Sequence, residues 1–438
     1  MKKETVILFF IFFVLSCKTS PIIEDIEGTS DKKHLESEVI DETNNDEIKW
    51  KLPRNIELGD VERRLNEQRH KFSIDLFKVA QKECVDKNFV ISPYSTAIAL
   101  SMLANGADGN TANELNNLLL DESSTLDDLN EYNHKIASEF VSLDNFTQFE
   151  VTNALFANIG LELVPQFVDY NRRFYNSPIT TVDFSKPIES TMTLNKWIEN
   201  ATHGLIKEML IKNNISFLVA NAVYFRSSWE KYFDKSKTIN ALFYNYDKTA
   251  STVKMMEGHN YNFSIDGRYV VIGLPYGNRS FSMYIAYNYE DQVDSLKGIE
   301  SILTFEKIKG YILRDRQGLG YVKLPRFEVS NSDVNINALL KKMGVIDLFS
   351  NQSDLSRLFK DNKTSSTFLI SHDCVLGIDE SGTVGASNTM IHMCTSPGEI
   401  TEPINFTVDH PFVFWIAEKS TGTILFMGQI NKLEDAKE

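Results

Sequence analysis

Near its middle the chain reads Phe217-Leu-Val-Ala-Asn-Ala-Val-Tyr-Phe225, a nearly continuous apolar run. Successive side chains of a strand point to opposite faces of its sheet, so both faces of this segment are apolar. The pattern predicts a strand in a sheet that is covered on both sides. Further strands are predicted at 150–158, 269–275, 280–287, 319–327, 366–378, 404–408, 412–418 and 423–430.

Helical patterns dominate the region before this run. Leu65 and Phe72 belong to a series of apolar residues that recurs on one helical face. Ser92-Pro93 predicts the start of a second helix, because serine is a good N-cap and proline fits the first turn. Thr111 followed by Glu114 predicts a capping box for a third helix. Helices mostly first and strands mostly later indicate an α+β fold with more than one sheet.

The composition excludes some classes of protein. Lys plus Arg is 45 and Asp plus Glu is 60, so the 438 residues carry a formal net charge of −15. A nucleic-acid binder needs concentrated positive charge to displace counterions, and we therefore expect no nucleic acid as a partner. Hydrophobic residues make up 42% of the chain, enough to bury a large core. Four Cys do not form a disulfide framework.

Residues 1–16 have the pattern of an export signal. Two lysines precede an apolar run from Val6 to Leu15, which rises about 15 Å as a helix and is too short to span a bilayer. The run ends in Val14-Leu-Ser-Cys17, which resembles the lipobox of bacterial lipoproteins. We therefore expect Cys17 to carry a lipid that anchors an exported protein to a bacterial outer membrane or cell surface. The alternative is an ordinary cleaved signal and a secreted protein.

The chain after the signal divides into three parts. Residues 17–60 are rich in acidic and small polar residues without a sustained period, which predicts a flexible tether. Residues 61–433 form one globular domain, and 434–438 are a short tail.

No familiar catalytic motif is present. Gly318-Leu-Gly320 is only half of a G-x-G-x-x-G motif and predicts a hairpin turn. No pair of the eight His has metal-ligand spacing, so we expect no metal and no cofactor. His372-Asp-Cys374 allows a cysteine–histidine site, but residues two apart on a strand share a face without forming a nucleophile–base pair. We favour a buried polar His, and we expect the protein not to be an enzyme.

One segment near the C-terminus is unusual. Glu380 and Glu399 bracket 18 residues without Asp, Glu, Lys or Arg, in a chain that is 24% charged. The first half is small and the second half is larger and β-prone. Neither face of such a strand would bring a charge into a buried environment. The segment suits an exposed loop in one state and a central strand in another; the alternative is a flexible surface loop of chance composition.

Long segments in a fixed order resemble the serpins, the serine-protease-inhibitor fold, over roughly residues 61–433. These segments are Asn88-Phe-Val-Ile-Ser-Pro-Tyr-Ser95, Thr202-His-Gly-Leu-Ile-Lys207, Asn221-Ala-Val-Tyr-Phe-Arg-Ser-Ser-Trp229, Leu324-Pro-Arg-Phe327, Met343-Gly344, Phe349-Ser350, Asp409-His-Pro-Phe-Val-Phe414 and Leu425-Phe-Met-Gly428. The resemblance implies about eight to nine helices around three β-sheets, with an exposed reactive-centre loop at about 380–405.

The resemblance also implies a mechanism. A target protease cuts the loop and forms an acyl-enzyme, and the cut loop then inserts as a new strand that traps the enzyme before deacylation. The inhibitor is a monomer that is consumed in the process. The runner-up is a non-inhibitory relative that acts as a binding protein or a protease substrate, and a membrane-anchored enzyme with an unrecognised site is more remote.

Site residues follow by position in the resemblance. The implied hinge comprises Glu380, Gly382, Thr383, Val384, Gly385 and Ala386. The implied shutter, where the sheet parts, comprises Ser92, Ser95, Asn221 and His372, and Trp229 matches the breach at the top of the sheet. Val384 stands where the family usually has Glu, at a position that faces out after insertion. Asn388 is bulkier than usual and is expected to slow insertion.

The bond that the protease cuts is predicted from the loop length. The usual count from Glu380 reaches Ser396, but Pro397 after that bond is resisted by most serine proteases. We therefore predict cleavage at Thr395–Ser396, with Cys394–Thr395 as the next choice. Small residues suit a shallow elastase-like pocket, and the absence of Arg and Lys argues against trypsin-like targets. Cysteine proteases remain a second class of target.

Overall fold

The computed structural model describes residues 51–436, apart from 209–214, 292–294, 314–317, 331–333, 361–367, 373 and 384–403. The contacts of the chain form two units, Met1–Glu47 and Ile48–Glu438, and every described residue belongs to the second. Within these ranges no helix has the length and apolar character needed to cross a membrane.

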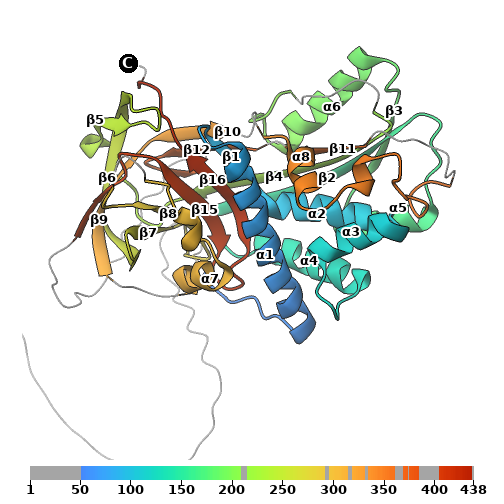
Figure 1. The fold of residues 1–438 in the computed structure, drawn as a ribbon, viewed down its shortest axis with the longest axis horizontal. Coiled ribbons are helices and arrows are strands. Elements are labelled where there is room, and N and C mark those ends of the chain that lie inside the picture. Colours follow the sequence, from blue (N-terminus) through green and yellow to red (C-terminus); the bar gives the residue numbers. More distant parts are fainter. Residues whose placement is uncertain are drawn as a thin grey trace, which may run out of the picture. The chain divides into compact units, whose positions relative to one another are not determined.

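The described residues contain eight α-helices, which Figure 1 labels. They are α1 (Asp60–Glu83), α2 (Pro93–Ala104), α3 (Gly109–Leu119), α4 (Leu126–Val141), α5 (Pro165–Tyr175), α6 (Pro187–Ala201), α7 (Phe305–Leu313) and α8 (Ile336–Lys342). The first three lie in the region where helical patterns were predicted, and Ser92 caps α2 by accepting a hydrogen bond from the Ser95 N–H.

The strands carry the labels β1 to β16. They are β1 (Phe89–Ile91), β2 (Thr147–Asn158), β3 (Ile179–Val182), β4 (Phe217–Ser228), β5 (Ile239–Tyr244), β6 (Ala250–Asp266), β7 (Tyr269–Pro275), β8 (Phe281–Asn288), β9 (Gly318–Pro325), β10 (Phe327–Ser330), β11 (Phe368–His372), β12 (Val375–Asp379), β13 (Gly382–Thr383), β14 (Ile404–Thr407), β15 (Phe412–Glu418) and β16 (Ile424–Ile430). Strands lie in all the predicted ranges, but the prediction at 319–327 extends from β9 into β10 and the prediction at 366–378 covers the two strands β11 and β12. The long β6 is one that the sequence pattern did not reveal.

The strands join into two hydrogen-bonded sheets. One has the order β1-β16-β15-β8-β7-β6-β9-β14 with β5 on β6, and the other has the order β10-β12-β13-β4-β2-β3 with β11 on β4. Three sheets were expected, and the difference lies in β6, whose 17 residues pair with β5 and β9 early and with β7 late. One long strand therefore joins two of the three sheets into a single ladder.

Strand β4 is covered on both faces, as its sequence predicted. Leu218 and Ala220 pack with Leu194 and Ile198 of α6, while Phe217 and its alternate neighbours belong to the main core. Figure 1 shows α6 on one side of β4 and β2 and α2 on the other. A segment that is apolar on both faces is thus buried by a helix on each side.

Two local predictions were wrong. Helix α3 begins after Asp108, whose side chain accepts from the Gly109 N–H, and Thr111 lies inside the helix. The Thr111 hydroxyl instead accepts a hydrogen bond from the Asp354 N–H at 2.9 Å, so it makes a tertiary contact and no capping box. Gly318 to Gly320 form the start of β9, paired with β6, and no hairpin turn.

Candidate functional site

The predicted hinge is already part of a sheet. Gly382 and Thr383 form β13, which lies between β12 and β4 and runs antiparallel to both. Thr383 pairs with Ile378 on one side and with Ser227 on the other. The chain reaches this place through a tight turn, because the Ser381 N–H donates to the Asp379 carboxylate at 2.7 Å. Two residues of the uncharged segment therefore occupy the sheet before any cut.

The hinge threonine is buried against two aromatic rings. Thr383 has no exposed surface, and its hydroxyl lies 2.5 Å from the hydroxyl of Tyr276. The Tyr276 ring stacks on Trp229 with centroids 4.4 Å apart, and the Trp229 indole N–H donates to the Asp379 carbonyl at 2.8 Å. Burial raises the pKa of Tyr276 far above its usual value, so the hydroxyl stays protonated. The predicted breach residue Trp229 thus holds the turn that leads into the hinge.

Gly382 meets a steric requirement that no other residue satisfies. Its φ of +151° lies in a region that residues with a Cβ rarely adopt, and a Cβ there would lie 2.0 Å from the Ser227 carbonyl oxygen. The predicted glycine of the hinge is therefore fixed by its approach to the β4 backbone.

Glu380 forms an ion pair beside the hinge with a partner that is 41% exposed. Its carboxylate accepts from the Arg326 guanidinium at 2.5 and 2.8 Å and from the Thr238 hydroxyl at 2.5 Å, and the side chain is 2% exposed. Burial on its own would raise the pKa of the Glu380 carboxyl, but the hydrogen bonds from Arg326 and Thr238 outweigh it and hold the pKa below its ordinary value. Arg326 lies within the Leu324–Phe327 segment that carried the resemblance, yet its role was not predicted.

Beyond the hinge, the two flanking strands are already in matching register. Ile378 and Ser227 flank Thr383, and their residue numbers differ by 151. Farther along, β11 pairs directly with β4 in parallel, from Phe368 with Phe217 to His372 with Asn221, and these numbers also differ by 151. A strand inserted between them would separate the two edges without shifting either along its length.

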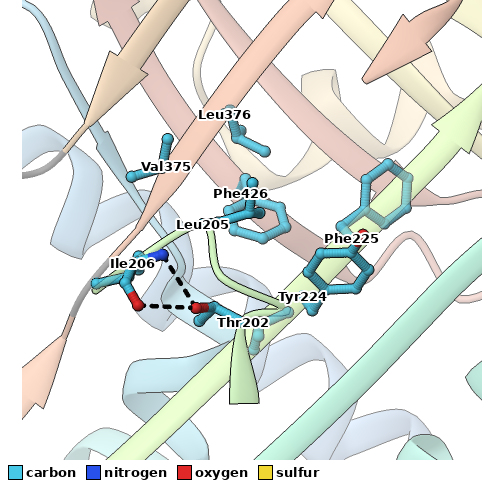
Figure 2. Close-up of a pocket in the computed structure, with 9 residues that line it drawn as sticks. Thr202, Leu205, Ile206, Tyr224, Phe225, Val375, Leu376 and Phe426 are labelled. Carbon is cyan, nitrogen blue, oxygen red and sulfur yellow. Dashed lines mark hydrogen bonds between the residues drawn. The ribbon is translucent and has the colours of Figure 1, made fainter. Parts of the chain in front are cut away.

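Between the hinge and this closed part, a short stretch of the two strands is covered by a loop. Leu205 and Ile206 lie over Tyr224 and Phe225 of β4 and over Val375 and Leu376 of β12, as Figure 2 shows. The Thr202 hydroxyl accepts from the Ile206 N–H at 3.0 Å and keeps the loop compact. The space enclosed is about 10 Å³, room for about one water molecule. The stretch is therefore packed and holds no ligand-sized cavity.

The four predicted shutter residues come together where β11 meets β4. The Ser92 N–H donates to Nε2 of His372 at 3.0 Å, and the Ser92 hydroxyl donates to the Leu425 carbonyl at 2.7 Å. The Ser95 hydroxyl donates to the Asn221 side chain. The structure adds Asn153 of β2, which accepts from the Asn221 amide and which the sequence did not single out. The cluster ties α2 to the four strands β2, β4, β11 and β16, including both edges that insertion would separate.

His372 is neutral in this cluster. It is buried, and desolvation lowers the pKa of its imidazole to about 4. A neutral ring is also what the hydrogen bond requires, because Nε2 accepts from Ser92. The Cys374 thiol lies 3.5 Å from the same nitrogen, which also accepts the hydrogen bond from the Ser92 N–H. Both side chains are buried, as a structural His and a small core Cys would be.

His372 predicts a loss of stability in mild acid. The imidazole takes up a proton below about pH 6.5 in the unfolded chain, but only below about pH 4 in the folded protein. The stability that the neutral ring contributes is therefore complete above pH 6.5 and is lost as the pH falls towards 4. Between pH 7 and pH 5 this residue alone is expected to cost about 2 kcal/mol.

The measurement is urea unfolding at both pH values for the wild type and for His372→Gln, whose amide oxygen also accepts a hydrogen bond. The variant should lose about 2 kcal/mol less between pH 7 and pH 5. Since His70 is also buried with a pKa lowered to about 4, part of the pH dependence should remain. Superposable pH dependences in the two proteins would contradict the assignment.

Other predicted site residues lie outside the described residues. They are Val384, Gly385 and Ala386 of the hinge, Asn388, Cys394, Thr395, Ser396 and Pro397 of the loop, and Cys17, the predicted lipidation site. Within the described ranges, no three His, Cys, Asp or Glu side chains gather as metal ligands.

Comparisons with known proteins bear on this arrangement. The model of the serpin (serine protease inhibitor) family matches residues 67–433. Plasminogen activator inhibitor 1 of Neovison vison is 30% identical over 373 residues, which is 82% of this chain and 90% of that protein. Leukocyte elastase inhibitor of Homo sapiens is 30% identical over 383 residues, 82% of this chain and 97% of that protein.

A solved structure agrees with these matches. Native protease nexin-1 with heparin aligns with a TM-score of 0.73 and 25% identity, over 85% of this chain and all of that one. The family model covers far more than half of the sequence. The chain therefore belongs to the serpin family of serine protease inhibitors.

Proposed function

We propose that this protein is a suicide inhibitor of endopeptidases, with serine proteases as the main targets and cysteine proteases as a second class. The observation that carries the proposal is the position of β13, because the hinge residues Gly382 and Thr383 already pair between β12 and β4. The rest of the loop needs only to continue the same ladder. Each residue added to the ladder would gain paired backbone groups, so insertion would release free energy.

The register gives the extent of this ladder. Continuing from Thr383, residue 393 would lie opposite Phe217 on β4 and opposite Phe368 on β11, where both strands end. Thr389 would then lie beside Asn221 and His372 of the shutter, on the inward face. Asn388 would lie opposite Ala222, on the face that α6 covers, which supports slow insertion at this position. The ladder ends two residues before Thr395, which supports Thr395–Ser396 as the cut bond.

The chemistry of the trap is an interrupted acyl transfer. The protease serine attacks the Thr395 carbonyl, an ester forms, and the amine of Ser396 leaves with the C-terminal part of the loop. Insertion then competes with attack of water on the ester. Small residues at the cut favour an elastase-like pocket, and the likeness to a leukocyte elastase inhibitor supports the same target class. Export with a lipid on Cys17 would place the inhibitor on a bacterial surface, where it would shield the cell from foreign proteases.

A panel of proteases tests the proposal. Incubation with elastase-like, chymotrypsin-like, trypsin-like and papain-like enzymes, read on a denaturing gel, should give a covalent band with the elastase-like enzyme and none with the trypsin-like one. The mass of the released peptide should correspond to a peptide that begins at Ser396. A loop that is cut without a covalent band would identify a substrate or binding protein, and a cut N-terminal to Met390 would refute the placement of the bond.

A further inference from the structure

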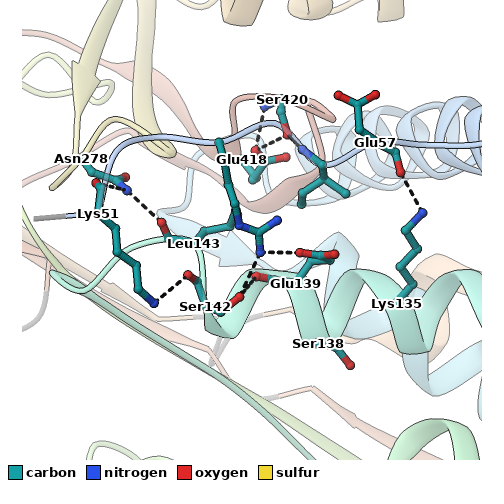
Figure 3. Close-up of polar contacts among 12 residues, drawn as sticks. Lys51, Glu57, Lys135, Ser138, Glu139, Ser142, Leu143, Asn278, Glu418 and Ser420 are labelled. Atoms are coloured by element: carbon teal, nitrogen blue, oxygen red, sulfur yellow. Dashed lines mark hydrogen bonds and ion pairs between the residues drawn. The ribbon is translucent and has the colours of Figure 1, made fainter. Parts of the chain in front are cut away.

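The segment before α1, residues 51–59, forms neither helix nor strand, yet it is fixed to the body along its length (Figure 3). We call these residues the strap. The Lys51 ammonium donates to the Ser142 carbonyl at 3.1 Å. Arg54 pairs with Glu139 and donates to the Ser142 hydroxyl at 3.0 Å. These contacts hold the first half of the strap to the C-terminal end of α4.

The second half of the strap is anchored by a buried side chain. Ile56 is 5% exposed, and its N–H donates to the Ser420 hydroxyl at 3.0 Å, in the turn between β15 and β16. Lys135 of α4 donates to the Glu57 carbonyl at 2.7 Å and pairs with Glu62 of α1 at 2.7 Å. An exposed ion pair contributes little, so the burial of Ile56 supplies most of the docking free energy.

The strap also completes the hydrogen bonding of a buried amide. Asn278, which is 4% exposed, donates to the Lys51 carbonyl at 3.1 Å and to the Leu143 carbonyl at 2.8 Å. Figure 3 shows Asn278 between these two partners. If the strap left, one buried donor would lose its partner, at the cost of an unsatisfied polar group. Asn278 therefore links the strap to the α4–β2 connection.

From Asn278 the contacts continue to the hinge within a few residues. Asn278 lies in the turn between β7 and β8, in which the Gly277 N–H donates to the Ser228 carbonyl of β4 at 2.9 Å. Tyr276 of the same turn contacts the Thr383 hydroxyl. A second series of contacts reaches the hinge from the start of β2. The Thr147 hydroxyl lies 2.6 Å from the hydroxyl of Ser227, and Ser227 pairs with Thr383.

The strap also connects elements of both sheets. Helix α4 is followed directly in the chain by β2, and β2 pairs with β4 at eleven positions from Thr147 to Ala157. We therefore expect α4 and β2 to move with β4 if β4 separates from β12. The turn at Asn278 and the turn at Ser420 belong to the other sheet. A docked strap therefore ties the α4–β2 connection to two turns of the other sheet.

We propose that the strap is a positioning element of the hinge: by holding Asn278 it fixes the turn that carries Tyr276, and through it Thr383, and so slows insertion of the uncut loop. The second part of this statement rests on the proposed function, whereas the first concerns the intact protein alone. Among the described residues, no hydrogen bond or ion pair joins the strap directly to Gly382 or Thr383.

Amide hydrogen exchange of the full chain tests the first part. Ile56→Ser removes the buried anchor, and Leu52→Ser is the matched control, because Leu52 lies in the same strap with 86% of its surface exposed. The amides of Gly382, Thr383, Ser227 and Ser228 are expected to exchange roughly tenfold faster in Ile56→Ser and at the wild-type rate in Leu52→Ser. The paired amides of Val413 and Ala286, in the other sheet, report on the whole body and should not change.

Two results would overturn the proposal. One is an equal exchange rate at the hinge in both variants; the other is an equal acceleration at Val413 and Ala286, which would mean general loosening. Arg54→Gln provides a variant that keeps the buried anchor if Ile56→Ser does not fold, and a roughly twofold acceleration confined to the hinge is expected.

A second measurement separates the strap from the proposed function. Intact protein is incubated at 37 °C, and its remaining capacity to form the covalent complex should fall faster for Ile56→Ser than for Leu52→Ser. If no protease is trapped by any variant, the proposed function fails and the exchange experiment still decides on the strap. If trapping is normal and the hinge amides do not respond, the strap proposal alone fails.

Discussion

Thr383→Arg is expected to abolish the covalent complex and to give a protein that its target protease cuts and releases. Thr383 has no exposed surface, and its hydroxyl contacts Tyr276 beside the Trp229 ring. A guanidinium at this place would have to be buried without an acidic partner, since the nearby Glu380 already pairs with Arg326. Insertion would be slowed at its first residue, and each 1.4 kcal/mol added to its barrier favours deacylation about tenfold.

The measurement is the ratio of covalent band to cut inhibitor on a denaturing gel. Thr383→Ser keeps the hydroxyl and should retain most of the complex. Thr407→Arg adds the same charge at an exposed position of β14 and should behave as the wild type. If Thr383→Arg still gave the complex in wild-type yield, resistant to heat and detergent, insertion would not proceed through this hinge.

Cleavage of the loop is expected to raise the unfolding temperature of the protein by about 10 °C or more. Ten residues after Thr383 would add a central strand with neighbours on both sides. With about 1 kcal/mol of net stabilisation from each new hydrogen bond, the gain is on the order of 10 kcal/mol. For a domain of this size, 1 kcal/mol corresponds to roughly 1 °C in the unfolding temperature.

Calorimetry of intact and elastase-cut protein checks this expectation. Thr383→Arg, cut at the same bond, serves as the control and should unfold at the temperature of the uncut variant. Equal unfolding temperatures for intact and cut wild type would mean that the severed segment gains nothing from the sheet, and the trapping mechanism would have no driving force.

The sequence predicted the central strand and the second helix because their signals are local. The run from Phe217 to Phe225 is apolar on both faces, and Ser92-Pro93 combines a cap with a residue suited to the first turn. Strand β6 escaped detection because Lys254, Glu257 and its other polar residues interrupt the apolar pattern. Strand β6 is stabilised by pairing with β5, β7 and β9, and these contacts cannot be read from its own sequence.

The residues of the candidate site were predicted only where they lie in segments that resemble the family. Ser92, Ser95, Asn221 and His372 lie in three distant segments, and no local pattern says that they meet. Tyr276 was missed because a lone aromatic after a strand has no distinctive signal; only the fold brings its hydroxyl to the hinge. The fold position of Thr111 was mispredicted for a related reason, since its partner Asp354 is remote in sequence.

The matching register of β4 with β11 and β12 also sets a distance. Ten residues in extended form span about 33 Å, so a protease held at the end of the ladder would be carried that far along the sheet. Such a displacement is comparable to the diameter of a small enzyme domain. Under the proposed mechanism, the length of β4 would therefore determine where the captured enzyme comes to rest, and a ladder shorter by a few residue pairs would leave it in a different place on the inhibitor.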